Sequence, residues 1–163
     1  MTPTRHTNLQ DLNYRISLTS RERLDRDKLV HDLSELAAAS RNAHEEAAAA
    51  IPAKLLAQDQ LRQEQARNKS LHHLREGAIT FPPTYKYKPG SRDELSSKRV
   101  PGWCDRVLYA SAAPAAEGEE VKVLSYRSVM EFTRSDHKPV SPGAFLLLSA
   151  TIFAESSASR VEG

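Results

Sequence analysis

The sequence predicts a mixed α/β fold, on three observations. Residues 21–50 are rich in Ala, Leu, Glu and Arg, and apolar positions in this stretch recur at helical spacing. Three later stretches, 106–111, 121–129 and 144–153, carry the β-branched, aromatic or apolar runs typical of strands. The 163 residues are 39% hydrophobic and 27% charged, which suits a globular chain with one core. The expected order is a strand, then helices, then strands, without an internal repeat.

Two helices are expected between residues 21 and 68. The first has one apolar stripe, and either Ser20 or Asp25 can serve as its N-cap. Pro52 interrupts the pattern, so a second helix is expected from about Ala53 to Asn68. The Ala-rich stretch 37–50 offers little to bury and is expected to be an exposed extension. The stripe consists of Leu29, Val30, Leu33, Leu36 and Ala37.

The second half is expected to be built from strands and loops. Residues 76–91, "EGAITFPPTYKYKPGS", predict a short strand that leads into an ordered loop, because prolines and glycines end any helical pattern. The apolar run at 144–153 predicts a last strand in a buried, central position. The polar tail after Glu155 is expected to be loose.

The net charge and the cysteine content limit which partners and which cellular compartment are expected. The net charge of +2 is too small to indicate a nucleic-acid partner. Residues 79–108 nevertheless carry six Lys or Arg against three Asp or Glu, which fits either an anionic ligand or a solvated basic loop. The single Cys104 cannot form an internal disulfide, and no base lies beside it for a catalytic thiol. A cytoplasmic chain is expected, with contact to the cytosolic face of a membrane left open.

The motif "DLNYRI" at 11–16 begins with a pair of polar residues, Asp11 and Asn13. Asp11 and Asn13 lie two apart, so in an extended segment they point to the same side. A carboxylate beside a carboxamide can orient a water molecule, accept its proton or help to hold Mg²⁺. A turn or a helix cap explains the same pair.

A second candidate pair joins "RVPGWCDRVLY" at 99–109 to "SDHKPV" at 135–140. His137 is suited to hydrogen-bond a phosphoryl oxygen as charge develops on it. Its other ring nitrogen then needs an acceptor, and Asp105 is the candidate if the strand at 106–111 runs beside residue 135. A solvent-exposed histidine in a polar loop is the simpler alternative.

Aromatic and basic residues alternate in "PTYKYK", and "SKR" follows at 97–99. This mixture fits a polyphosphorylated ligand, because Lys and Arg bind phosphate oxygens while Tyr packs or donates its hydroxyl. A single-stranded nucleic-acid surface would need more stacking aromatic residues than Tyr85, Tyr87 and Trp103.

The motifs "DLNYRI", "FPPTYKY", "RVPGWCDRVLY" and "SDHKPV", in this order, resemble the inositol polyphosphate 5-phosphatase family over about residues 10–153. The resemblance implies a DNase I-like two-sheet α/β sandwich. It also implies Mg²⁺-dependent removal of the 5-phosphate from phosphoinositide lipids or soluble inositol polyphosphates, with no nucleic acid as partner. Residues 10–153 would be a partial catalytic domain with an insertion at 37–50. Residues 1–9 would be a remnant and 154–163 a loose tail.

The resemblance also implies roles for single residues. Asp11 would orient and deprotonate the attacking water, and Asn13 would hydrogen-bond water or phosphate. His137 would stabilise the charge on the transferred phosphoryl group, with Asp105 orienting it and Asp136 near the metal. The residues implied as the clamp on the neighbouring 4-phosphate are Tyr85, Lys86, Lys98 and Arg99.

The chain departs from the family pattern at several points. Gln10 stands where the family has Gly, and a side chain there would crowd a turn. Gly102 stands where Ala or Ser is usual, which implies a more flexible backbone. The family's domain begins well upstream and takes a metal-binding Glu from that part, so only the C-terminal half of the sandwich is expected here. Two alternatives stay open: a catalytically inactive fragment that at most binds phosphoinositides, and a nuclease of the same superfamily.

Overall fold

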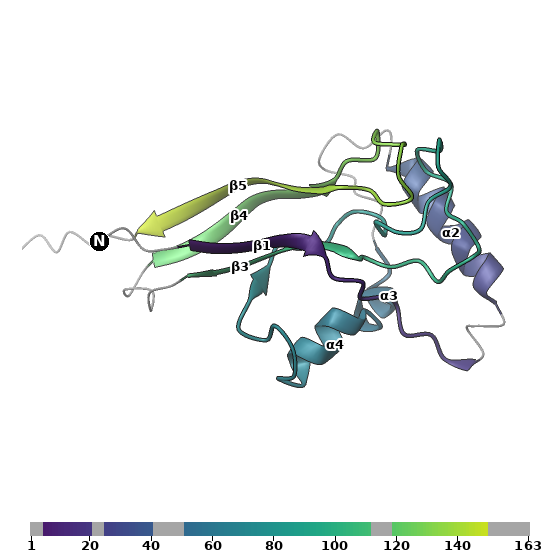
Figure 1. The fold of residues 1–163 in the computed structure, drawn as a ribbon. Coiled ribbons are helices and arrows are strands. Elements are labelled where there is room, and N and C mark those ends of the chain that lie inside the picture. Colours follow the sequence, from purple (N-terminus) through teal and green to yellow (C-terminus); the bar gives the residue numbers. More distant parts are fainter. Residues whose placement is uncertain (1–4, 21–24, 41–50, 112–118, 150–163) are drawn as a thin grey trace, which may run out of the picture.

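The computed structural model describes residues 5–20, 25–40, 51–111 and 119–149 (Figure 1). Strands and helices are mixed, as the sequence predicts. The helices are α2 (Arg26–Ala39), α3 (Ala53–Ala57) and α4 (Gln60–Ala66). The strands are β1 (Arg5–Asp11), β2 (Arg75–Glu76), β3 (Asp105–Ser111), β4 (Glu119–Ser128) and β5 (Val140–Ser149).

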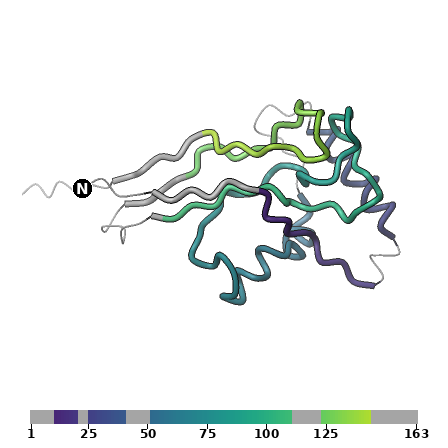
Figure 2. The backbone as a smooth tube through the Cα atoms, viewed as in Figure 1, coloured from purple at the N-terminus to yellow at the C-terminus, as the bar shows by residue number. Residues whose placement is uncertain are grey.

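The strands form two antiparallel sheets. The first has the order β1-β3-β2, and the second is the pair β4-β5. β3 also contacts β5, so the two sheets lie side by side, and the helices gather at the end of the strands where β1 finishes (Figure 1). β1 and β3, far apart in sequence, are neighbours in the first sheet (Figure 1). Figure 2 traces the path of the chain through the helices and the connecting loops. This arrangement agrees with the expected two-sheet architecture.

The strand predictions are confirmed at β3 and β4 and need correction elsewhere. β5 pairs with β4 alone, so in the described part of the chain the predicted central strand is an edge strand. The strand predicted near residue 76 is only β2, because the backbone after Glu76 leaves the sheet for the loop that carries Tyr85. β1 begins at Arg5, inside the segment predicted to be a remnant, and it runs through Gln10 without a turn for a side chain to crowd.

Helix α2 confirms the predicted apolar stripe. It begins directly after Asp25, whose side chain makes no capping hydrogen bond. The buried residues on its stripe pack against the loop that follows β2 and against the start of the β4–β5 connection. The hydroxyl of Ser34 fixes this contact, because it accepts a hydrogen bond from the Leu95 N–H at 3.1 Å. The packed residues are Val30, Leu33, Ala37, Tyr87, Leu95 and Met130.

The single helix predicted at 53–68 is wrong, because the chain breaks between α3 and α4. Asp59 has an extended backbone and forms an isolated β-bridge with Ile16. Its carboxylate accepts a hydrogen bond from the Arg62 N–H at 3.1 Å and thereby caps α4. Tertiary pairing with residues 15–17 therefore overrides the local helix propensity.

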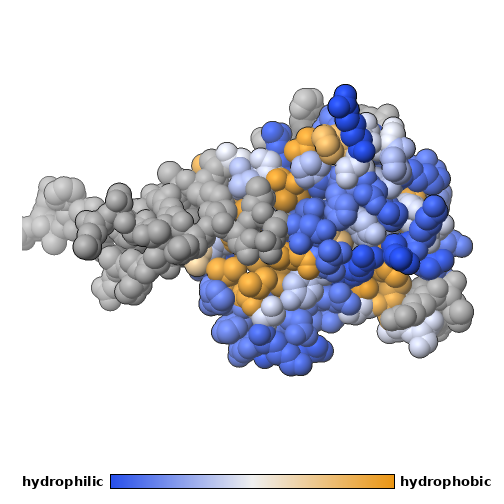
Figure 3. Space-filling model, viewed as in Figure 1, coloured by the Kyte–Doolittle hydropathy of each residue, from blue (hydrophilic) through white to orange (hydrophobic). Residues whose placement is uncertain are grey.

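The larger core cluster lies between the sheets and the loop that follows β2. Its largest member, Trp103, is fully buried and donates a hydrogen bond from Nε1 to the Phe81 carbonyl at 2.9 Å. The visible surface is mostly hydrophilic, with hydrophobic patches among the hydrophilic ones (Figure 3). Within the described residues, no helix has the length and apolar character needed to cross a bilayer. Most of the predicted insertion (residues 41–50), the end of the last predicted strand (150–153) and the predicted tail (154–163) lie outside the described residues.

Candidate active site

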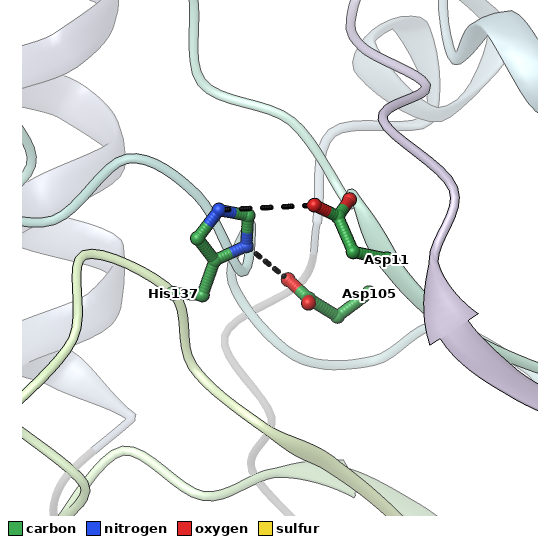
Figure 4. Close-up of side chains that lie close together, drawn as sticks. All are labelled: Asp11, Asp105 and His137. Carbon is green, nitrogen blue, oxygen red and sulfur yellow. Dashed lines mark hydrogen bonds and ion pairs between the residues drawn. The ribbon is translucent and has the colours of Figure 1, made fainter.

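Three of the predicted site residues converge at one end of the first sheet (Figure 4). Asp11 ends β1 and Asp105 begins β3, and the antiparallel register places them directly opposite each other. His137 lies on the loop that precedes β5 and pairs with Tyr85 in an isolated bridge. Sheet register and loop pairing together bring residues from three separate motifs to one point.

The imidazole of His137 lies between the two carboxylates. Its Nδ1 is 3.0 Å from Oδ2 of Asp105, and its Nε2 is 4.0 Å from Oδ2 of Asp11. The Asp105 contact confirms the predicted pairing and fixes the ring orientation. All three side chains keep some access to solvent, with exposed fractions of 38% for Asp11, 17% for Asp105 and 27% for His137. The site is therefore ordered but open.

Asp11 and Asn13 do not lie in one extended segment, because β1 ends at Asp11. Asn13 instead adopts a turn, which was the alternative explanation for this pair. Its φ of 54° lies in the left-handed region, which Asn tolerates better than most residues. Its backbone N–H donates to Oδ1 of Asp11 at 2.9 Å, and its Nδ2 donates to Oδ2 at 3.2 Å. A local turn thus brings Asn13 to the site, where it holds the Asp11 carboxylate.

Tyr85 forms the floor beside the histidine. It is 8% exposed, and its ring centroid lies 4.5 Å from that of His137 at an angle of 39°. The guanidinium carbon of Arg15 lies 4.7 Å from the Tyr85 ring centre, a cation–π contact. Sequence reasoning assigned no role to Arg15, although its place two residues after Asn13 in "DLNYRI" was the available signal.

Lys86 and Asp136 form an ion pair beside this floor. The hydrogen bond to the Asp136 carboxylate raises the pKa of Lys86, and the same bond lowers the pKa of Asp136. Among the described residues, Asp136 does not join the group of possible metal ligands formed by Asp11, Asp105 and His137. Its role near a metal stays a prediction.

Lys98 and Arg99 occupy a short exposed loop with both ends anchored at the floor. The Ser96 N–H donates to the Lys86 carbonyl at 2.7 Å, and the Gly102 N–H donates to the Tyr85 carbonyl at 2.9 Å. Within the described part of the chain, neither cationic side chain has a hydrogen bond or an ion pair. Both remain available to an anion, as the predicted clamp requires.

Gly102 is required by packing, whereas the sequence suggested only a more flexible backbone. A Cβ atom at this position would lie 2.9 Å from the Cα of Arg15 and 3.2 Å from the Tyr14 carbonyl oxygen. The absence of a side chain lets the "DLNYRI" segment approach the loop that anchors Tyr85.

The other residues of "WCDR" build the interior. Cys104 is fully buried and its thiol lies 3.4 Å from the Tyr14 carbonyl. Burial raises its pKa to about 12, so the thiol is poorly suited to act as a nucleophile. Arg106 is also fully buried, and its guanidinium forms ion pairs with Asp59 at 3.0 Å and Glu76 at 2.6 Å. Burial alone would lower the pKa of Arg106, but these two carboxylates raise it above its ordinary value.

The three-residue group has the composition of a site for a hard cation. One ligand atom from each of Asp11, Asp105 and His137 lies within 4.8 Å of the others. Carboxylate oxygens suit Mg²⁺ and Ca²⁺, which also take oxygen ligands from a bound phosphate. With the Asp105 carboxylate engaged by the imidazole, Asp11 is the most accessible oxygen donor of the group.

Comparison with known proteins decides the family. Residues 7–143 match the model of endonuclease/exonuclease/phosphatase family 2. The chain belongs to this family. The type II inositol 1,4,5-trisphosphate 5-phosphatase of Mus musculus is 40% identical over 135 residues, which are 82% of this chain and 11% of the mouse protein. A phosphatidylinositol 4,5-bisphosphate 5-phosphatase of Saccharomyces cerevisiae is 38% identical over 90 residues, covering 54% of this chain and 9% of its own length.

The chain is similar to solved structures of proteins with different functions. The inositol polyphosphate 5-phosphatase domain of synaptojanin, in complex with inositol (1,4)-bisphosphate and calcium ion, is 28% identical with a TM-score of 0.56, over 88% of this chain and 34% of that one. A Cimex nitrophorin, solved as a ferrous NO complex, is 27% identical with a TM-score of 0.59, over 83% and 39%. The DNase I-like fold and the 5-phosphatase resemblance are confirmed, while the function must be argued from the site.

Proposed function

We propose that the family member described by this chain is a Mg²⁺-dependent phosphoric monoester hydrolase. It removes the 5-phosphate from phosphoinositides or inositol polyphosphates. The observation that carries the proposal is the placement of His137, 3.0 Å from the Asp105 carboxylate and 4.0 Å from that of Asp11.

The two carboxylates would have complementary tasks. Asp105 would accept a hydrogen bond from Nδ1–H of His137, which leaves Nε2 directed toward the open side of the site, where Asp11 lies. By donating a hydrogen bond from Nε2, the ring would stabilise the charge that develops on the phosphoryl oxygens. Asp105 in turn holds the ring in this orientation.

Asp11 is positioned to activate the water. Asn13 holds its carboxylate from two directions, and the side chain stays accessible to solvent. Water attacks the phosphorus atom while Asp11 accepts one of its protons. The phosphorus–oxygen bond to the inositol ring breaks, and the departing ring oxygen takes a proton from solvent. Positioning and charge stabilisation are the main demands of this reaction.

A metal ion fits the donors that the chain offers. The carboxylate of Asp11 would hold Mg²⁺, and Asp136 would join after release from Lys86. When bound, the ion neutralises charge on the phosphate group and lowers the barrier to attack. The calcium ion in the synaptojanin complex supports a divalent cation in this family.

The exposed cations explain how an inositol ring with several phosphates would be held. Lys98 and Arg99 lie on the loop whose ends are hydrogen-bonded to the backbone of Tyr85 and Lys86. Two exposed cations that have no partner among the described residues favour a phosphate that neighbours the reacting one. We further propose a cytoplasmic protein that meets its lipid substrate at the cytosolic membrane face.

The decisive experiment measures phosphate release from soluble inositol 1,4,5-trisphosphate and from vesicles containing phosphatidylinositol 4,5-bisphosphate. We expect Mg²⁺-dependent release that EDTA abolishes, and a decrease of about 10²–10⁴-fold in His137→Ala. Lys88→Met is the matched control, because this exposed lysine pairs with Glu94 of its own loop. A folded chain that binds the inositol phosphate without releasing phosphate would instead support the inactive fragment.

A further inference from the structure

A second polar hollow lies apart from the candidate active site. It has a volume of about 620 Å³ and runs along β4, between the loop after β2 and the end of α2. None of Asp11, Asp105, His137, Tyr85 and Lys86 lines it. We call it the β4 cleft. Its polar lining residues are Ser40, Thr80, Arg92, Ser125, Arg127, Ser128 and Glu131.

Arg92 lines this cleft, and its guanidinium group is only partly satisfied by hydrogen bonds within the described residues. Its Nη2 donates to Glu131 at 3.1 Å, and only 23% of the side chain is exposed. Its Nη1 is buried and has no hydrogen-bond partner in the described part of the chain. A buried donor without an acceptor is costly, so turning the guanidinium toward an acceptor in the cleft would be favourable.

Positive charge dominates the wall of the β4 cleft. Arg92 and Arg127 face one carboxylate, Glu131, whose pKa is lowered by its own backbone N–H and by both arginines. Behind the wall lies the fully buried Lys138, which donates to the backbone carbonyls of Ser91, Met130 and Phe132 at 2.9–3.2 Å. These bonds neutralise no charge, and the carboxylates that act on Lys138 are Asp93 and Glu131, so the three cations outnumber the carboxylates here.

We propose that the β4 cleft binds a phosphate group, with the guanidinium of Arg92 and the exposed Arg127 as its cationic donors. A phosphate offers enough acceptor oxygens for both guanidinium groups and for the nearby hydroxyls of Thr80, Ser125 and Ser128. Lys138 directly follows His137 and is hydrogen-bonded to the backbone of this wall. A bound phosphate would therefore also stabilise the loop that carries the histidine. The proposal does not depend on hydrolysis at the other site.

The test is a titration of the full chain with inorganic phosphate, followed by amide NMR. We expect shifts at Arg92 and at residues 125–131, with an affinity that falls by about tenfold in Arg92→Met. Arg127→Met removes an exposed side chain and should weaken binding in the same direction without unfolding the protein. His137→Ala should leave these shifts unchanged, and so should Lys88→Met, which alters a cation on the same loop as Arg92 but outside the cleft.

Vesicles of phosphatidylcholine, with and without phosphatidylinositol 4-phosphate, distinguish the source of the phosphate. The Lys86→Met variant is sedimented with the charged vesicles, with and without the additional Arg92→Met substitution. If Arg92→Met abolishes the sedimentation, the ligand of the β4 cleft is a lipid headgroup. Binding of inorganic phosphate alone would assign the free ion. The proposal is overturned if phosphate shifts only residues around His137, or if Arg92→Met and Arg127→Met both bind phosphate like the wild type.

Discussion

Asp105 and Arg106 are neighbours on β3, yet their side chains belong to two charged clusters with opposite properties. The closed cluster joins Arg106 to Asp59 and Glu76. The side chains of Arg106 and Asp59 are 0% exposed, and that of Glu76 is 8% exposed. The open cluster joins Asp105 to Asp11 and His137, which all retain access to solvent. Strand geometry separates the two, because successive side chains point to opposite faces of a sheet.

The closed cluster is saturated with hydrogen bonds. The Arg106 guanidinium donates to both oxygens of Asp59 and both oxygens of Glu76. The Tyr126 hydroxyl donates to Glu76 as well, and it accepts a bond from the Val107 N–H. The cluster thereby joins β3, β2, β4 and the start of α4, which is a structural task.

The open cluster carries a local cost. The register of β1 and β3 sets Asp11 opposite Asp105, and like charges in this position destabilise a sheet. Functional sites commonly retain such unfavourable arrangements. The charge of a motif residue therefore does not reveal its role. Arg106 stabilises the fold and Asp105 belongs to the candidate active site, and the two differ in the face of β3 to which their side chains point.

The largest effect is expected from breaking the closed cluster. Arg106→Met leaves Asp59 and Glu76 buried without their cation, so we expect a loss of about 3–5 kcal/mol in the free energy of unfolding. Denaturant unfolding measures this loss. Arg99→Met, an exposed arginine of the same motif, is the matched control and should change stability by less than about 0.5 kcal/mol. Equal stability of the two variants would contradict a structural role for Arg106.

The open cluster should respond in the opposite direction. Asp11→Asn removes one of two facing carboxylates, so we expect the free energy of unfolding to rise by about 0.2–1 kcal/mol. Phosphate release should fall by about 10²-fold or more, because the general base is lost. Thermal melting and the phosphate assay together check this prediction. A destabilised Asp11→Asn would show that the carboxylate supports the fold.

The sequence predicted the local features of this site better than its long-range features. Helical spacing identified the stripe of α2, and the motifs identified Asp11, Asp105 and His137, because each signal lies within a few residues. The break at Asp59 was missed, since it depends on pairing with Ile16 across the fold. The same holds for Arg106, whose ion pairs are made by residues of two other elements.

A smaller effect should appear at alkaline pH. Burial raises the pKa of Cys104 from 9.0 to about 12, so the folded chain keeps a proton that the unfolded chain releases. Stability is therefore complete below pH 9 and falls as the pH rises from 9 toward 12. Cys104→Ala should reduce this slope without abolishing it, because burial also raises the pKa of Tyr87 and Tyr126. Denaturant unfolding on both sides of pH 9 checks the slope, and an identical slope in Cys104→Ala would contradict it.

The central claim is that Asp105 acts through His137, and a double-mutant cycle tests it most directly. Phosphate release is measured for the wild type, Asp105→Asn, His137→Ala and the double variant. Because Asp105 touches the imidazole at 3.0 Å and serves to orient it, we expect the double variant to be no slower than His137→Ala alone. Losses that multiply in the double variant would show that the two residues act independently and would contradict the account.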